Sequence, residues 1–508
     1  MAHATSLKRF SAVFAAVVLL SLGARNAQAQ NPTPEATPDT TRVNQDELAS
    51  FYGRMNVVVG SGARAFGMGG AFLARADDAT AASWNPAGLS YLRRTEVSVV
   101  GAHNDFLQRI PKLNQVGGTS EVETRDQLQG SVADFIGAVY PLRIGERTGA
   151  IQVSYQRSFS FTGSRKSEGP VGVRGFASDD TLVLPTEFTV KGEGGFDTLS
   201  LSSGFELHPR LRLGVSVNRW INGFSQTVDR PDAQTGGYRR IASSWDISGT
   251  NFNLGAIFIP TPKLNLGAVL KTPFRADVRL TKVREDQTSK PDPDTGKRPL
   301  ADSNYGTSES VSIRFPRVYG LGVSYRATNT ITISADFTRT AWSKSTIDGF
   351  FSLARRPRTD VAEPLENGVD TLIDHYDTLP FPAVEEGANG QADTNQFRVG
   401  AEWVLRLGQS GNVLIPLRAG FFRDGQPVII GLNDANGAPL PEKQPTFSGL
   451  TAGIGVTVGG ALFDLAYIRE RGDVDAARKN ESSEADATKS IRYSRIFASV
   501  MFRFGQRR

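Results

Sequence analysis

The sequence predicts an all-β fold: a transmembrane antiparallel β-barrel of about 14 strands, with an N-terminal segment inside its lumen. Three observations predict this fold. Short runs that alternate apolar and polar residues follow one another from Thr95 to the end of the chain. The gaps between these runs alternate strictly between tight and long. The chain also begins with an export signal, so an outer membrane is an accessible destination.

Residues 1–29 have the three parts of a secretory signal peptide. Lys8 and Arg9 are basic, Phe10 to Leu22 is apolar, and Ala27 to Ala29 supplies small residues before cleavage. The apolar run is shorter than the roughly 20 residues of a spanning helix, which favours a removable signal over an inner-membrane anchor. The chain has no Cys, so we expect no lipid attachment, disulfide or thiolate metal site.

The charge balance does not suggest a nucleic-acid partner. The 57 basic residues exceed the 52 acidic ones by only five, and Lys8, Arg9 and Arg25 lie in the signal. No nucleic-acid binding is therefore expected. A Pro/Thr-rich, polar stretch follows at residues 30–50, and its composition predicts an extended, flexible segment.

The spacing of the turns supplies the strand count. The tight turns lie at 141–149, 207–214, 259–267, 325–332, 405–413 and 457–462. The long polar stretches lie at 104–130, 162–194, 224–244, 283–308, 343–395, 424–446 and 471–489. Six tight turns and seven long loops join about 14 strands. Outer-membrane barrels have short turns at one end and long loops at the other, so we expect residues 94–508 to form such a barrel.

The two faces of the strands differ in polarity. In residues 311–325 the odd positions are mostly apolar and the even ones small or polar, and residues 264–280 are similar. The lumen of a 14-stranded barrel is too wide for side chains to fill, so the apolar face should contact lipid. The lumen face then carries a charge ladder of Lys271, Arg275, Arg314, Arg398, Arg418, Asp336, Glu402 and Asp464.

Aromatic residues mark the ends of the predicted strands. Trp220, Trp245 and Trp342 precede long loops and predict an outer interfacial girdle, with buried core aromatics as the alternative. The last strand, Ile496 to Phe504, alternates and ends in an aromatic residue close to the C-terminus. It is similar to the signal that the barrel-assembly machinery recognises, so that machinery is an expected partner.

Residues 51–93 are rich in Gly and Ala and do not match a nucleotide-binding loop. Neither G-x-G-x-x-G nor G-x-x-x-x-G-K-[ST] occurs in them. Asp77, Asp78 and Thr80 can cap a short helix, and Pro86 ends it at Asn85. The small side chains make the segment slim enough to lie inside the barrel as a hatch. Its motif consists of Gly67, Gly69, Gly70, Asp77, Asp78, Asn85, Pro86 and Ala87.

This segment resembles the N-terminal region of the FadL family, outer-membrane transporters of long-chain fatty acids and other hydrophobic compounds. The Gly/Ala run, Ala76 to Ala79 and Asn85 to Ala87 carry the resemblance, and Phe315 to Arg326 resembles a mid-barrel strand of that family. It implies passive uptake at the outer membrane, with binding in the lumen and exit beside the hatch. The exit of the family is a wall gap at a kinked third strand. Here the third strand, Ala150 to Phe161, contains no Gly or Pro that would explain a kink.

The resemblance leaves a second function open. PorV-like relatives carry a similar hatch and serve as secretion or surface-attachment modules. For the transport function, the expected partners are outer-membrane lipid and a hydrophobic small molecule. Arg314 and Arg418 are candidates for binding an acidic head group. Candidates for the apolar tail are Phe66, Met68, Phe72, Leu73 and Trp84, with packing of the hatch as the alternative.

No enzymatic activity, cofactor or metal is expected. The chain has four His and lacks G-x-S-x-G and H-E-x-x-H. Asp374 beside His375 is the alternative catalytic pair of a barrel enzyme. The acidic run Asp292 to Gly296 fits a solvated turn better than a calcium loop.

Overall fold

The computed structural model describes residues 60–111, 123–174, 181–231, 238–287, 303–349, 355–357, 376–378, 392–407, 413–427, 444–476 and 487–505. The predicted signal peptide, the segment 30–50 and residues 51–59 lie outside these ranges. The acidic run 292–296 and the pair Asp374 and His375 also lie outside them. None of the helices within the described ranges is long and apolar enough to cross a membrane.

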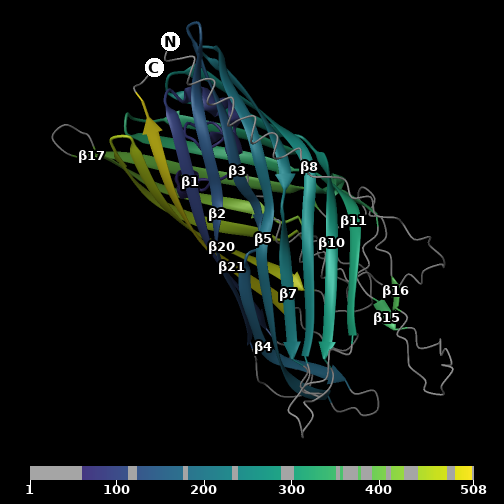
Figure 1. Cartoon of the computed structure of the whole chain (residues 1–508). Coiled ribbons are helices and arrows are strands. Elements are labelled where there is room, and N and C mark those ends of the chain that lie inside the picture. Colours follow the sequence, from purple (N-terminus) through teal and green to yellow (C-terminus); the bar gives the residue numbers. More distant parts are fainter. Residues whose placement is uncertain are drawn as a thin grey trace, which may run out of the picture. The chain divides into compact units, whose positions relative to one another are not determined.

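The wall is a closed barrel of fourteen antiparallel strands, as the turn spacing predicted (Figure 1). Five of them consist of two consecutive segments: β3 and β4, β6 and β7, β9 and β10, β11 and β12, and β13 and β14. Thr95 of the first strand pairs with Phe504 of the last, which closes the wall. A separate two-stranded sheet joins β15 (Arg355–Pro357) and β16 (Tyr376–Thr378).

The bounds of the wall segments are as follows: β1 (Thr95–Pro111), β2 (Glu123–Ile144), β3 (Arg147–Ser160), β4 (Gly163–Arg174), β5 (Thr181–His208), β6 (Leu211–Ile221), β7 (Gly223–Pro231), β8 (Tyr238–Thr261), β9 (Leu264–Lys271), β10 (Phe274–Gln287), β11 (Ser303–Phe315), β12 (Val318–Arg326), β13 (Ile331–Thr340), β14 (Thr346–Gly349), β17 (Thr394–Leu407), β18 (Val413–Gly425), β19 (Thr446–Val458), β20 (Ala461–Ala476) and β21 (Ala487–Phe504).

Tight turns gather at one end of the barrel, which we call the tight-turn end, and the opposite end is the loop end. The turns at 145–146, 209–210, 262–263 and 459–460 join neighbouring strands directly. The strands extend further toward the loop end than predicted, since β1 and β2 take up most of the predicted loop 104–130. Antiparallel pairing needs only backbone hydrogen bonds, so it continues where the alternation of hydrophobicity has stopped.

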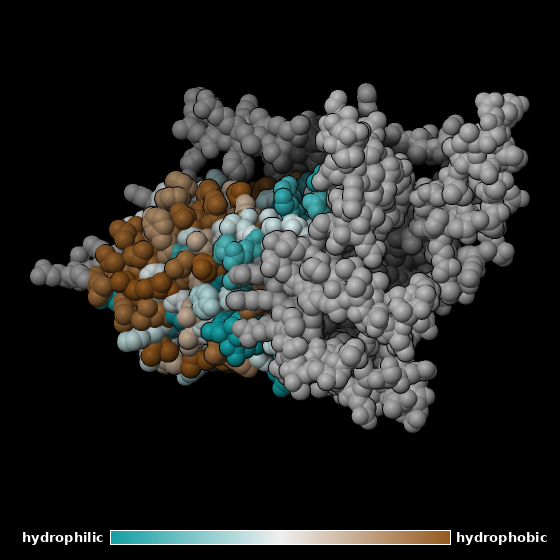
Figure 2. Space-filling model, turned by 90° about the horizontal axis from the view of Figure 1, so that it is seen from below, coloured by the Kyte–Doolittle hydropathy of each residue, from teal (hydrophilic) through white to brown (hydrophobic). Residues whose placement is uncertain are grey.

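An apolar belt covers the outward face of the wall. Leu321 on β12 and Leu450 on β19 are 61% and 67% exposed. Their neighbours along the strands point into the lumen and are small or polar. Figure 2 shows apolar residues gathered in one broad zone of the surface in view, with hydrophilic residues along one side. This pattern confirms the prediction that the apolar face points outward.

The alternation shifts by one residue at several interruptions, and two sequence predictions fail there. Inward residues of β12 have even numbers, but Ile313 and Phe315 of β11 are buried inward. Arg314 therefore lies on the outward face, and the shift at 272–273 places Arg275 there too, beside it in register. The prediction that these two arginines face the lumen is wrong, because a one-residue slip moves every later side chain to the other face.

The segment Gly60–Leu92, which we call the N-terminal segment, lies within the lumen. It contains α3 (Ala63–Gly67), α4 (Ala81–Trp84) and the 3-10 helix η1 (Pro86–Tyr91). Helix α3 contacts β18 to β21, whereas η1 contacts β3, β5, β6 and β8. The segment therefore spans the lumen between two arcs of the wall.

Close approach of two backbones explains the glycines on both sides of this contact. A Cβ added at Gly420 of β18 would lie 2.3 Å from the Gly69 nitrogen. Gly69 itself has φ of 69°, which favours glycine, and an added Cβ would lie 2.9 Å from the Val399 carbonyl oxygen. Glycine is thus required both in the N-terminal segment and on the wall.

Candidate ligand cavity

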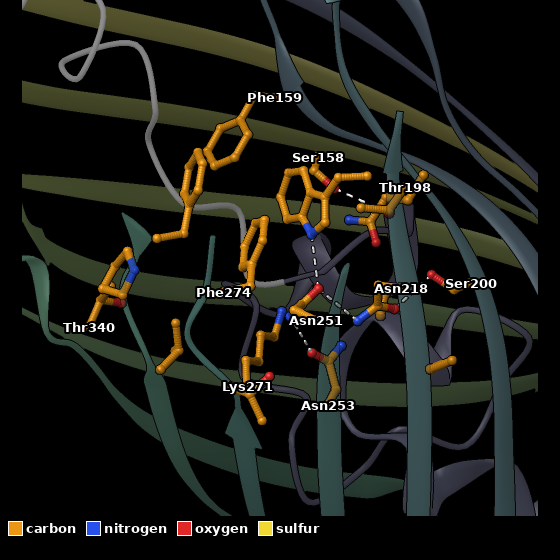
Figure 3. A pocket seen from close by; sticks show the side chains of 18 of the residues that line it. Ser158, Phe159, Thr198, Ser200, Asn218, Asn251, Asn253, Lys271, Phe274 and Thr340 are labelled. Atoms are coloured by element: carbon orange, nitrogen blue, oxygen red, sulfur yellow. Dashed lines mark hydrogen bonds between the residues drawn. The ribbon is translucent and has the colours of Figure 1, made fainter. Parts of the chain in front are cut away.

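A cavity lies in the lumen between helix α4 and the strands from β3 to β13 (Figure 3). Together with its mouth it holds about 790 Å³ of space not occupied by protein atoms. Ala82 and Ser83 contribute one side from the N-terminal segment, and the rest of the lining comes from inward residues of the wall.

Amide side chains form a polar ladder on one side of the cavity. Asn218 donates to Asn251 Oδ1 over 3.3 Å, and Asn251 donates to Asn253 Oδ1 over 3.4 Å. These residues point inward because they occupy alternating positions of β6 and β8. Lys271, at the end of β9, extends toward Asn251 and Asn253 in Figure 3. The cavity therefore has a cation beside amide groups, which can accept or donate hydrogen bonds to a ligand head group.

Stacked aromatic rings form the other side of the cavity. The Trp220 ring is 5.1 Å from Phe274 and 5.8 Å from Phe315, and both rings are stacked on it. Phe159 also stacks on Trp220, with the two ring centroids 5.8 Å apart. Trp220 is only 9% exposed and donates to Asn251 Oδ1 over 2.9 Å. Aromatic and amide surfaces thus meet at Trp220.

The prediction of an outer tryptophan girdle is wrong for these residues. Trp220 and Trp342 are buried and line the cavity, and Trp245 stacks on the buried Phe224. The alternative interpretation, buried aromatics, holds for Trp220 and Trp342, whereas Trp245 is half-buried. The girdle prediction fails because Trp220 on β6 and Trp245 on β8 occupy positions that point into the lumen, on the same face as the asparagines.

The wall beside the cavity contains an interruption in strand pairing, which we call the seam. Phe135 of β2 pairs with Gln156 of β3, and Gln129 pairs with Ser164 of β4. Between these pairs, residues 130–134 of β2 and 157–163 of the third strand have no pairing with each other. Ser158 and Phe159 belong to both the seam and the cavity lining. Cavity and seam are therefore adjacent.

The seam corrects the expectation drawn from the third strand. Ala150 to Phe161 has no Gly or Pro, yet β3 ends at Ser160 after a bulge between Arg157 and Phe159. The glycines lie next to the break: Gly163 opens β4, and Gly194 on β5 has φ of 93°. Phe161 donates its backbone N–H to the Gly194 carbonyl oxygen over 3.1 Å. The break in the third strand is thus held by the neighbouring strand β5. The residue pattern of the third strand alone therefore does not predict it.

Ion pairs anchor the N-terminal segment to the wall opposite the cavity. The Glu402 carboxylate of β17, 3% exposed, binds Arg64, Arg75 and Arg418. The Arg418 Nη1 atom also lies 2.6 Å from Asp464 Oδ1. Arg418 is therefore engaged by two carboxylates and does not line the cavity, so the charge-ladder interpretation fits it better than head-group binding.

Further contacts fix the middle of the segment. Asp336 of β13 accepts the backbone N–H groups of Phe72 and Leu73 over 2.6 and 2.8 Å. Arg398 donates to the Gly69 carbonyl oxygen over 3.1 Å and to Asp424 over 2.5 Å. Near the seam, Ser61 donates to Asp134 of β2. The segment is thus bound to the wall on several sides.

The polar residues of the predicted hatch motif stabilise the segment itself. Asp77 pairs with Arg64 over 2.7 Å, and Asp78 accepts the Thr80 N–H over 2.9 Å. Asn85 donates to the Leu73 carbonyl oxygen and accepts from the Ala87 N–H, at 2.9 and 3.1 Å. Pro86 begins η1, where its missing N–H costs nothing. Helix α4 starts at Ala81, directly after Thr80, and ends before Asn85, as Pro86 predicts.

The predicted apolar ligand contacts lie away from the cavity. They pack instead between the N-terminal segment and the wall, and none lines the cavity: Phe66, Met68, Phe72, Leu73 and Trp84. The sequence did place Lys271 on the lumen face, but it missed Asn218, Asn251 and Asn253. The sequence does contain a pattern that predicts these asparagines in the lumen: the alternation in β6 and β8 places the amide side chains on one face.

Comparison with known proteins supports the fold. The family model described as BamG matches residues 176–355, about a third of the chain. No curated protein matches the sequence. A Pseudomonas aeruginosa FadL homologue has a TM-score of 0.54 at 14% identity, covering 88% of this chain and 99% of that one.

Two further solved structures have the same coverage of this chain. The TodX deltaS2S3 mutant monoaromatic hydrocarbon channel has a TM-score of 0.50 at 13% identity and is covered to 100%. The Ralstonia pickettii toluene transporter TbuX has a TM-score of 0.48 at 15% identity and is covered to 99%. At such identities the likeness to the FadL homologue concerns the fold: the chain is a FadL-like barrel, and the resemblance predicted from its sequence is confirmed at that level.

Proposed function

We propose that the protein is an outer-membrane transporter for the passive uptake of hydrophobic molecules. The observation that carries this proposal is the position of the cavity. It lies between the N-terminal segment and the seam, and its lining combines stacked aromatics with an amide ladder and Lys271. The likeness in fold to the FadL homologue and to the monoaromatic hydrocarbon channel supports the same proposal.

The lining suggests how a ligand binds. An acyl chain or aromatic ring packs on Trp220, Phe274 and Phe315, which contribute apolar area without polar groups facing the ligand. An acidic head group lies near Lys271 and accepts hydrogen bonds from the asparagine amides. Long-chain fatty acids have both features, and we therefore propose them as a substrate class.

The N-terminal segment and the seam suggest the route. The segment closes the lumen, so a ligand that enters from the loop end stops at the cavity. Ser158 and Phe159 connect the cavity to the seam, where β2 has no pairing with the third strand. A hydrophobic ligand leaves sideways along this border into the membrane, without crossing the tight-turn end.

Binding is tested by tryptophan fluorescence of the purified protein in a detergent without long alkyl chains. Trp220 and Trp342 line the cavity, so a long-chain fatty acid and its methyl ester should both change the emission. Lys271→Met should weaken binding of the acid by about 10- to 100-fold and leave the ester within about twofold, as expected for losing one charged hydrogen bond. Lys263→Met, in the exposed turn between β8 and β9, is the matched control.

A second set of results would refute the transport proposal. If neither acid nor ester alters the fluorescence, and deletion of the gene leaves fatty-acid uptake by cells unchanged, the transport proposal fails. A PorV-like secretion or attachment role predicts instead a stable complex with other envelope proteins in a pull-down.

A further inference from the structure

Four arginines gather on the outward face near the loop end, and we call them the arginine patch. They are Arg423 of β18, Arg469 and Arg471 of β20, and Arg492 of β21. Arg423 pairs in register with Ser448, Ser448 with Arg471, and Arg471 with Arg492. Neighbouring strands are about 4.8 Å apart, so the Cα atoms of Arg423 and Arg471 are roughly 10 Å apart.

Most of the positive charge of the patch is not neutralised by carboxylates. Arg423, Arg469 and Arg471 are exposed and form no ion pair with any described residue. The acids next to them in sequence point the other way: Asp424 binds Arg398, and Glu470 binds Arg495 in the lumen. Two outward acids, Asp105 and Asp473, lie at the border of the patch.

The apolar belt begins directly beside the patch. Leu450, the most exposed large apolar side chain described, pairs with both Phe421 and Arg469. Tyr467 and Ile496 continue the exposed apolar surface toward the tight-turn end. A molecule that covers this surface must therefore combine an anionic group with apolar chains.

Other outward arginines lie beside apolar residues at the loop end. Arg219, Arg317 and Arg339 each lie two residues beyond an outward apolar residue, namely Val217, Tyr319 and Phe337. At the tight-turn end, outward rows finish on Tyr325, Trp403 and Phe504 instead. Arg219, Arg317 and Arg339 thus lie where the outward apolar belt meets the polar residues of the loop end.

We propose that the arginine patch binds the phosphate groups of a phosphorylated lipid in the membrane leaflet at the loop end, whose acyl chains lie along Phe421, Leu450 and Tyr467. Guanidinium groups bind phosphate oxygens through paired hydrogen bonds, whereas exposed lysines would act as point charges. Spacing over three strands suits a head group that carries more than one phosphate. This interaction is separate from transport through the lumen and would fix the barrel in its leaflet.

Native mass spectrometry of the purified barrel with a bisphosphorylated lipid A tests the proposal. The variant Arg423→Gln/Arg469→Gln/Arg471→Gln should bind it about 100-fold more weakly, at about fivefold for each arginine. The matched control is Arg147→Gln/Arg210→Gln/Arg406→Gln, which changes exposed arginines near the tight-turn end and should bind as the unmodified protein does. Heat-modifiable migration in gels verifies that all variants are folded.

Three outcomes would overturn the proposal. The first is equal lipid A binding by the triple variant and the unmodified protein. The second is equal binding of the same lipid without phosphates. The third is binding of inorganic phosphate as tight as that of the lipid, because the apolar rows would then contribute nothing.

Discussion

Glu402→Gln should release the N-terminal segment from the wall. Glu402 is the shared partner of Arg64, Arg75 and Arg418, and the substitution keeps its size while removing its charge. Arg64 keeps Asp77, and Arg418 keeps Asp464. Arg75 has no second carboxylate among the described residues, and its Nε and Nη1 atoms already have no hydrogen-bond partner.

The magnitude follows from this unequal compensation. Breaking a buried ion pair by removing one partner costs about 3–5 kcal/mol, because the remaining charge is buried without compensation. Arg75 is 13% exposed, so most of this cost applies. The population of barrels with a displaced segment should rise by about 10²- to 10³-fold, since 1.4 kcal/mol corresponds to a factor of ten.

Two assays report on this displacement. Cells that carry the variant should take up small hydrophilic antibiotics faster, and residues 60–92 should exchange amide hydrogens faster in the purified barrel. Adding Arg75→Gln removes the uncompensated cation and should restore a large part of the protection. Asp393→Asn is the control, because its pair with the half-exposed Arg339 lies outside the lumen and contributes about 1 kcal/mol at most.

If Glu402→Gln leaves both antibiotic uptake and amide exchange of residues 60–92 at the level of Asp393→Asn, the ion pairs do not hold the segment in place.

Three further predictions concern the segment, the cavity and the seam. Gly420→Leu should displace the segment and raise antibiotic uptake, because its Cβ would lie 2.3 Å from the Gly69 nitrogen; Ala419→Leu, on the outward face, should not. Trp220→Ala should weaken binding of both the fatty acid and its ester by about 10-fold or more through loss of the stacked surface, measured by calorimetry, and equal affinities would contradict this. Deleting Ser61 to Leu89 should raise permeability while the barrel stays folded, and unchanged permeability would mean that the segment does not block the lumen.

The strand count and closure followed from features local in sequence. Tight turns depend on short-range residue choice, and outward residues of one strand segment repeat every second position. The composition of the Gly/Ala-rich segment also predicted its position inside the lumen, because small side chains allow its backbone to contact the wall closely. Glycines such as Gly420 on the wall complete this contact, and no pattern within the segment indicated them.

The cavity was harder to predict because it depends on register between strands. An unbroken alternation through Pro316 predicts Phe315 on the lipid face and Arg314 in the lumen, but the interruption between β11 and β12 reverses both. The seam depends on Gly163 and Gly194, which lie outside the predicted third strand, Ala150 to Phe161. Pairwise arrangement of strands decides these features, and it is not visible in one strand at a time.

Locating a bound ligand tests the central claim most directly. A crystal of the protein with 12-bromododecanoic acid reports the bromine position by anomalous scattering. We predict bromine within the cavity, near the stacked rings of Trp220, Phe274 and Phe315, and the carboxylate beside Lys271. Bromine found only on the outward apolar belt, with the cavity empty, would contradict the account.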